Sequence, residues 1–190
     1  MKIEEICNCD KCNLCKNQKP LLDISKKPDI FWVGLSAKKI NSENEIPLSP
    51  STNSGMVIKK IEDSYKNFTF YKTNLVKCLP LDENKKLRYP NKKEIESCIS
   101  NLSTEIKELS PKIVFLLGEK VYSSIEKQLN IKFEKWNEFE FKYKQYNNVY
   151  YVPVQHPSYI YVYKRNKIDE YVNGIKNIIN KLMKNTPLSV

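Results

Sequence analysis

The feature that most constrains the fold is a regular alternation between short apolar runs and longer amphipathic segments. The short runs have the length and apolar content of buried strands and lie at residues 29–34, 70–76, 112–117 and 149–154. The segments with helical periodicity lie at residues 54–66, 91–109, 119–129 and 166–183. This order predicts a three-layer α/β/α fold around a central, mainly parallel four-stranded sheet.

Local signals mark where some of these elements begin. Pro90 precedes the segment 91–109, where Asn91 is a good N-cap and Glu94 completes a capping box. Asn53 or Ser54 is the expected N-cap of the segment 54–66. The aromatic and charged residues 131–146 are predicted as strand or loop, and residues 185–190 as a frayed tail.

Length and charge narrow the class of protein. A chain of 190 residues is expected to form one domain, spanning residues 1–190. We expect a cytoplasmic protein without a membrane partner, because no apolar run reaches transmembrane length and residues 1–6 lack the apolar core of a signal peptide. Monomer is the default state. The net charge of +10 fits a polyanionic partner such as DNA, although an AT-rich genome also explains a lysine-rich composition.

The cysteines indicate a metal centre. Four lie close together near the N-terminus and two stand alone, namely Cys7, Cys9, Cys12 and Cys15, then Cys78 and Cys98. In a reducing cytoplasm, C-x-x-C spacing favours a metal or an iron–sulfur cluster over disulfides. A zinc ribbon needs a second C-x-x-C pair far along the chain, whereas two distant single cysteines suit an iron–sulfur cluster. Two alternatives stay open: a zinc-bound structural module, and single cysteines that are merely buried.

Polar and glycine residues follow three of the predicted strands. Gly34 ends the first, Asn74 lies at the end of the second, and His156, the only histidine, follows the last. In open parallel sheets, ligands bind beyond the carboxyl ends of the strands. The sequence therefore predicts one cleft that brings these three residues together.

Five segments of the sequence together resemble a known family. This family is the iron–sulfur members of the uracil-DNA glycosylase superfamily, called family four and family five. The resemblance runs from Cys9 to about Arg165 and rests on five segments. In chain order they are Cys9-x-x-Cys12-x-Leu14, residues 33–37 (VGLSA), residues 73–78 (TNLVKC), Glu94-x-x-x-Cys98 with Leu102, and residues 156–159 (HPSY).

The resemblance implies a 4Fe-4S cluster held by four cysteines, with residues 1–28 as the N-terminal cluster-binding segment. The implied ligands are Cys9, Cys12, Cys78 and Cys98. Cys15 can replace Cys9, because Cys12 and Cys15 also form a C-x-x-C pair, and Cys7 has no assigned role. In this family the cluster braces loops that meet DNA and takes no part in the chemistry.

The resemblance also implies roles in the cleft. Asn74 would read the pairing edge of a flipped base, and His156 would donate a hydrogen bond to the departing base. Without the family, the less favoured alternative is that Asn74 caps a loop. The backbone that lines the base pocket would be Gly34, Leu35, Ser36 and Ala37. The residues expected to contact DNA are Ser158, Tyr159, Lys164 and Arg165.

Two departures from the family pattern concern the substrate. Leu35 stands where family four has an acidic residue, so the carboxylate that activates water is not evident. Glu43 and Glu45 are candidates for it, and Asn53 is an alternative that orients a water. Leu48 takes the place of an aromatic residue that stacks on the base, which favours a wider pocket.

The leading hypothesis is a monofunctional DNA glycosylase that flips uracil or another modified pyrimidine and hydrolyses its N-glycosidic bond, leaving an abasic site. Two alternatives are an enzyme of the same chemistry that acts on bulky modified bases of phage DNA in defence, and a non-catalytic DNA-binding relative. The defence alternative rests on the departures from the family pattern at Leu48 and Leu35. The non-catalytic alternative rests on the missing carboxylate that would activate water.

Overall fold

The computed structural model describes residues 2–25, 27–42, 44–134 and 137–184. A central sheet has the strand order β2-β1-β3-β5-β4. Its strands are β1 (Ile30–Ser36), β2 (Phe70–Val76), β3 (Ile113–Leu117), β4 (Lys144–Tyr146) and β5 (Val149–Val154). Four of them are parallel, and β4 pairs with β5 in the antiparallel direction.

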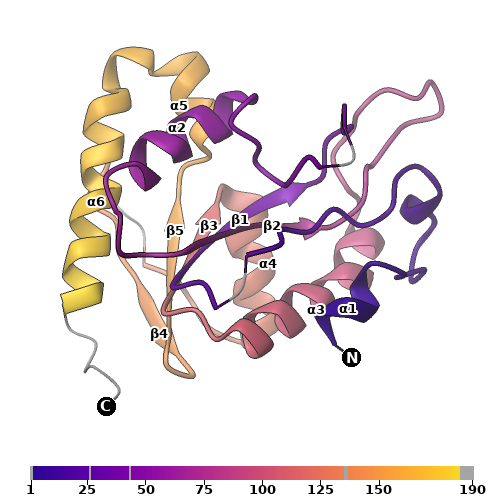
Figure 1. Ribbon diagram of the computed structural model, residues 1–190, viewed down its shortest axis with the longest axis horizontal. Coiled ribbons are helices and arrows are strands. Elements are labelled where there is room, and N and C mark those ends of the chain that lie inside the picture. The colour runs from indigo at the N-terminus through magenta and orange to yellow at the C-terminus, as the bar shows by residue number, and fades with distance from the viewer. Residues whose placement is uncertain (1, 26, 43, 135–136, 185–190) are drawn as a thin grey trace.

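Helices cover both faces of this sheet (Figure 1). One face is covered by α2 (Asn53–Glu62), α5 (Pro157–Tyr163) and α6 (Ile168–Lys184), and the other by α3 (Lys92–Leu109) and α4 (Glu119–Leu129). Short turns of helix complete the set, namely α1 (Ile3–Ile6), η1 (Asn13–Lys16) and η2 (Arg165–Lys167). The architecture is thus the predicted α/β/α arrangement.

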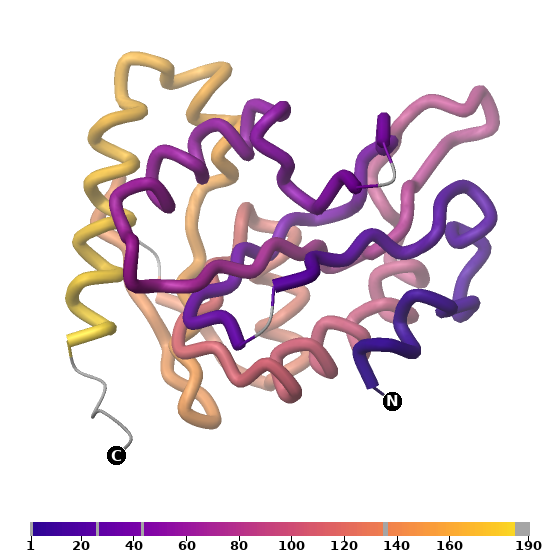
Figure 2. Tube along the Cα trace, in the orientation of Figure 1, coloured from indigo at the N-terminus to yellow at the C-terminus, as the bar shows by residue number. Residues whose placement is uncertain are grey.

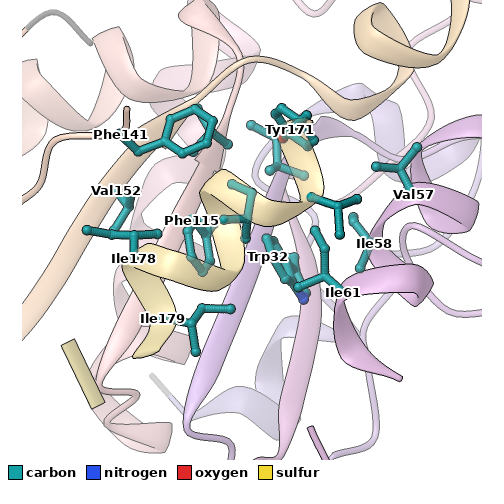
Figure 3. Packing of buried hydrophobic residues seen from close by; sticks show 14 of the residues in the cluster. Trp32, Val57, Ile58, Ile61, Phe115, Phe141, Val152, Tyr171, Ile178 and Ile179 are labelled. Atoms are coloured by element: carbon teal, nitrogen blue, oxygen red, sulfur yellow. The ribbon is translucent and has the colours of Figure 1, made fainter. Parts of the chain in front are cut away.

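The strands have continuous apolar sequences because successive side chains pack into two hydrophobic cores, one on each face of the sheet. Trp32 and Phe115 point toward α2 and α6, where they stack at 4.5 Å between ring centroids (Figure 3). Phe31 and Val33 point to the opposite face and pack with residues of α3 and α4. A parallel sheet that is buried on both faces requires this pattern.

The N-terminal segment runs alongside the loop that follows β2 (Figure 2). Leu21 donates its backbone N–H to the carbonyl of Lys77 at 2.9 Å, and Asn17 donates its side-chain amide to the carbonyl of Leu79 at 3.0 Å. These bonds attach residues that are far apart in the sequence to the same end of the sheet. They also place the N-terminal cysteines close to Cys78.

Some details of the elements differ from the sequence predictions. The sheet has five strands, because the region 131–146 contributes the short edge strand β4. Thr52, rather than Asn53 or Ser54, caps α2 by accepting a hydrogen bond from the Gly55 N–H at 3.0 Å. Helix α5 was not predicted, because its short, aromatic and β-branched sequence has no helical periodicity.

Other predictions agree closely with the structure. Strands β2 and β5 and helix α4 have the predicted bounds, and Asn91 and Glu94 form the expected capping box at the start of α3. Residues 185–190, predicted as a tail, lie outside the described residues. Within the part of the chain that the structure describes, no helix is long and apolar enough to cross a membrane.

Candidate active site

A cavity of about 720 Å³ opens at the carboxyl ends of the parallel strands. It is lined by the end of β1, by Asn74 of β2, by the turn from β3 into α4, and by His156 and α5 beyond β5. The predicted convergence of Gly34, an amide and the histidine is therefore observed in one cavity. Gly34 lies within β1, however, and not in the predicted turn at its end, because the strand continues to Ser36.

Strand register sets the position of Asn74. Gly34 and Asn74 are partners in the parallel pairing of β1 with β2. The Asn74 side chain lies across Gly34 so closely that a Cβ atom on Gly34 would sit 2.4 Å from its Oδ1. Gly34 is therefore required for close approach, since any side chain there would displace the Asn74 amide.

His156 is held as a neutral imidazole. Its Nδ1 accepts a hydrogen bond from the Ser158 backbone N–H at 3.3 Å and lies 2.7 Å from the Ser158 hydroxyl. Burial, aided by the positive charge of Lys38, lowers the pKa of His156 to about 4. Because Nδ1 is an acceptor, the ring carries its proton on Nε2 and presents a hydrogen-bond donor at neutral pH.

A hydrogen bond from α6 fixes the backbone next to His156. Tyr171, fully buried on α6, donates its hydroxyl to the carbonyl of Gln155 at 2.8 Å. His156 itself is the N-cap residue of α5, and Pro157 occupies the first helical position. Thus α6 and α5 together hold the histidine where the loop leaves β5.

The loop after β1 supplies one wall of the cavity. Leu48 lines the cavity in a left-handed backbone conformation with a φ of 52°, and one of its methyl carbons would lie 3.3 Å from a Cβ on Gly34. Glu45 also lines the cavity, and one of its carboxylate oxygens accepts the Asn41 N–H at 2.8 Å. Glu43 lies outside the described residues.

Not every predicted residue faces the cavity. Leu35, Ser36, Ser158 and Tyr159 line it, whereas Ala37 is buried beside it. Asn53 is exposed in the first turn of α2 and is not among the lining residues, where Thr52 and Ser54 are found instead.

Lys164 and Arg165 also lie outside the cavity lining, and both are held by aromatic rings. The Lys164 amine lies 6.0 Å from the ring centre of Phe139, and the Arg165 guanidinium 5.3 Å from that of Tyr161. Both residues directly follow α5, and this helix lines the cavity. They therefore lie beyond the C-terminal end of a helix that borders the cavity.

Exposed apolar side chains surround the mouth of the cavity. On α5, Tyr159 and Tyr163 pack at 5.3 Å between ring centroids, and Tyr163 is 74% exposed. The loop after β2 contributes Leu87 and Tyr89, which is 71% exposed and has the Lys120 amine 5.0 Å from its ring centre. Exposed aromatic residues beside cationic groups suit contact with nucleic-acid bases and phosphates.

This loop after β2 is ordered by its own hydrogen bonds. The carboxylate of Asp82 accepts the backbone N–H groups of Asn84 and Lys86. Arg88 donates to the Leu81 carbonyl and forms a two-pronged ion pair with Glu94 at the start of α3. No motif in the sequence assigns residues 87–89 to the site. The only signal that points near them is the family resemblance, which implies DNA contacts in loops braced by a cluster.

The cysteines gather at one end of β2 and α3. Cys78 and Cys98 are buried, with Cys12 and Cys15 packed against them. Asn101 donates its amide to Cys9 Sγ at 3.3 Å and to Cys98 Sγ at 3.7 Å. Among the described residues, no three His, Cys, Asp or Glu side chains already form a metal-binding group. The sulfur atoms therefore share one neighbourhood without a closed ligand geometry.

Comparisons with known proteins show the family and the fold of this chain. Residues 22–179 match the family model described as the uracil DNA glycosylase superfamily. The type-4 uracil-DNA glycosylase of Saccharolobus solfataricus is 27% identical over 163 residues, which cover 82% of this chain and 72% of that protein. The crystal structure of SMUG2 from Pedobacter heparinus has the same fold, with a TM-score of 0.51, 14% identity, and coverage of 83% of this chain and 76% of that one.

Proposed function

Because the chain belongs to the uracil DNA glycosylase superfamily, we propose that it is a monofunctional DNA N-glycosylase. It flips uracil or another modified pyrimidine out of DNA, hydrolyses the N-glycosidic bond and leaves an abasic site. The observation that carries this proposal is the arrangement of Asn74 and His156 in one cavity at the carboxyl ends of the sheet.

The two side chains have complementary tasks. The Asn74 amide offers one donor and one acceptor group, which match the pairing edge of a pyrimidine. His156 offers a neutral Nε2–H to the base oxygen on which negative charge develops as the bond to the sugar breaks. A donor placed where charge develops lowers the barrier by roughly 3–4 kcal/mol. The pKa of His156, about 4, keeps it in this state at physiological pH.

Within this proposal, Glu45 is the carboxylate that positions the attacking water. It lines the cavity, whereas Asn53 is exposed outside the lining. Glu45→Gln should lower the excision rate by about 100-fold, in the range of general-base catalysis, and Asn53→Ala should change it less than about twofold. The reverse result in single-turnover assays would transfer the role to Asn53.

We also propose that the chain carries a 4Fe-4S cluster, bound by the segment 1–28 together with Cys78 and Cys98. The donor set fits this group, because soft thiolates are its usual ligands and two sulfurs already accept hydrogen bonds from Asn101. The cluster would order the loop after β2 and leave the chemistry to the cavity.

Cys9 is the proposed fourth ligand rather than Cys15. The amide of Asn101 contacts both Cys9 and Cys98, whereas the thiol of Cys15 donates to the Cys12 carbonyl at 3.1 Å. Cys9→Ser should therefore lose bound iron and the brown colour, and Cys15→Ser should keep both. Iron analysis after anaerobic purification decides between them, and loss of iron only in Cys15→Ser would contradict the assignment.

DNA is the proposed partner, bound by a monomer. Ser158 and Tyr159 at the cavity, with Lys164 and Arg165 beyond α5, would contact the strand on either side of the flipped nucleotide. The exposed side chains of Leu87 and Tyr89 would meet the bases across the cavity mouth. Counterion release by the cationic residues makes the binding salt-dependent.

The decisive experiment measures base release. The anaerobically purified protein is offered oligonucleotides that carry uracil, hypoxanthine or a modified cytosine, and alkali then cleaves any abasic site. We expect cleavage of the uracil strand and the loss of most of this cleavage with His156→Ala. Cleavage only of the modified cytosine would identify a bulky base as the substrate. Salt-sensitive binding of all three strands without cleavage would refute catalysis and identify a non-catalytic relative.

A further inference from the structure

Lys77 and Glu105 form an ion pair in the interior of the protein. Both side chains have no solvent exposure, and the amine bonds directly to the carboxylate. The carboxylate also accepts hydrogen bonds from the hydroxyls of Tyr71 at 2.9 Å and Thr73 at 3.0 Å. Burying two charges is costly, so such a pair calls for a reason beyond packing.

The amine of Lys77 holds the backbone of the proposed base-reading residue. Its Nζ donates to the Asn74 carbonyl at 2.6 Å and lies 2.6 Å from the Thr73 hydroxyl. Side chains alternate along β2, so Thr73 faces α3 while Asn74 faces α2 and the cavity. Lys77 therefore fixes the Asn74 peptide from the face of the sheet opposite to the Asn74 amide.

The backbone of Lys77 is attached to the cysteine end of the molecule. Its N–H donates to Cys98 Sγ at 3.4 Å, and its carbonyl accepts the Leu21 N–H from the N-terminal segment at 2.9 Å. The next residue is Cys78. A single residue thus contacts both a proposed cluster ligand and the residue that reads the base.

We propose that Lys77, paired with Glu105, is a positioning residue that couples the iron–sulfur cluster to base recognition by Asn74. This inference rests on the proposed function and extends it. With the cluster bound, the backbone at residues 77–78 is fixed and the amine holds the Asn74 carbonyl. Without the cluster, this hold loosens and the Asn74 amide loses its orientation across Gly34.

The same strand offers a matched control. Lys72 bonds Glu62 of α2 at 2.8 Å, and its side chain is only 8% exposed. This second pair is buried on β2 as well, but the Lys72 amine bonds a carboxylate of α2 rather than the Asn74 carbonyl. Neutralising the Lys72–Glu62 pair measures the effect of losing a buried ion pair that does not hold the Asn74 backbone.

The experiment compares two double variants, Lys77→Met with Glu105→Gln and Lys72→Met with Glu62→Gln. Each removes both charges, so neither leaves one buried alone. The probe is a uracil-containing oligonucleotide, and the measurements are single-turnover excision, iron content and hydrogen exchange of residues 72–78. Each protein is measured before and after its cluster is removed by oxidation and chelation.

We expect removal of the cluster from the wild type to slow excision at least about 10-fold and to speed exchange at residues 72–78, as expected for a mispositioned group. The Lys77/Glu105 variant should show both changes with full iron content, and cluster removal should add little to either. The Lys72/Glu62 variant should behave like the wild type. A Lys77/Glu105 variant with normal excision and exchange, or equal losses in both variants, would overturn the proposal.

Two further arms keep the test decisive. If the double variant does not fold, Lys77→Gln with Glu105→Gln also leaves no charge buried alone, shortens the side chain that reaches the Asn74 carbonyl, and keeps an acceptor for Tyr71 and Thr73. If the wild type releases no uracil, the proposed function is refuted, but the coupling can still be tested. Hydrogen exchange of residues 72–78 then tests whether the cluster and Asn74 are coupled. Cluster removal must then speed exchange in the wild type and leave it unchanged in the Lys77/Glu105 variant.

Discussion

The two ends of the central sheet each carry a cavity, and the two cavities differ in what surrounds them. The cavity at the carboxyl ends, about 720 Å³, contains the only histidine, the Asn74 amide and carboxylates. The second, about 510 Å³, lies at the amino ends of β3 and β5 between α3 and α4. Among the described residues that line it, there is no histidine and no carboxylate.

The difference follows from the connections at each end. At the amino ends the chain turns tightly: Asn147 and Asn148 form a two-residue turn with positive φ values between β4 and β5, and Ser110 ends α3 in the left-handed conformation. Such residues are selected for backbone geometry. At the carboxyl ends, the longer loops after β1 and β2 can carry side chains that suit a ligand. The two cavities are similar in volume, so the side chains that line a cavity, and not its volume, distinguish the candidate site.

The strongest test of this contrast is His156→Ala. Loss of the Nε2–H donor should slow uracil excision by about 10²–10³-fold. Tyr151→Phe removes a hydroxyl at the other cavity and should leave the rate unchanged. Single-turnover rates measure both, and near-normal excision by His156→Ala would remove the functional distinction between the two ends.

A smaller loss should follow from Gly34→Ala. The new methyl group would sit 2.4 Å from Asn74 Oδ1, so the amide must move, and excision should fall roughly 10–100-fold. Asn148→Gly suits the positive φ at the amino end and should keep full activity. Equal rates for Gly34→Ala and the wild type would show that the orientation of Asn74 is unimportant.

The pKa of His156 predicts a difference in acid stability between the wild type and His156→Gln. The unfolded histidine binds a proton near pH 6.5, and the folded one only near pH 4. The unfolded state therefore takes up more protons as the pH falls through this window, which lowers the free energy of unfolding. Urea unfolding at pH 7 and pH 4.5 should show the wild type losing about 2 kcal/mol more than the variant. Equal losses would contradict the buried, neutral histidine.

The smallest expected effect concerns DNA affinity. Lys120 lines the carboxyl-end cavity beside Tyr89, whereas Lys107 lines the amino-end cavity. Lys120→Ala should weaken binding a few-fold and reduce the salt dependence by about one counterion. Lys107→Ala should change neither quantity. Salt titrations by fluorescence anisotropy compare them, and a larger effect of Lys107→Ala would place the DNA on the other side.

The sequence by itself determined the layer architecture and the end of the sheet that carries the candidate site. Apolar runs on strands such as β3 require burial on both faces, and that burial requires helices on both sides. Gly34 and Asn74 lie near the carboxyl ends of two parallel strands and His156 follows a third, so they meet at one edge of such a sheet. The family suggested by these motifs is confirmed by the family model.

Tertiary structure alone decided the contacts between distant segments. Helix α5 forms although its sequence is strand-like, because it packs against α2 and α6. The ion pair of Lys77 with Glu105, 28 positions apart, has no local pattern that would reveal it. Leu87 and Tyr89 line the cavity from a loop that Arg88 attaches to Glu94 of α3. Local periodicity reports which faces are buried, whereas the choice of partner depends on how the layers come together.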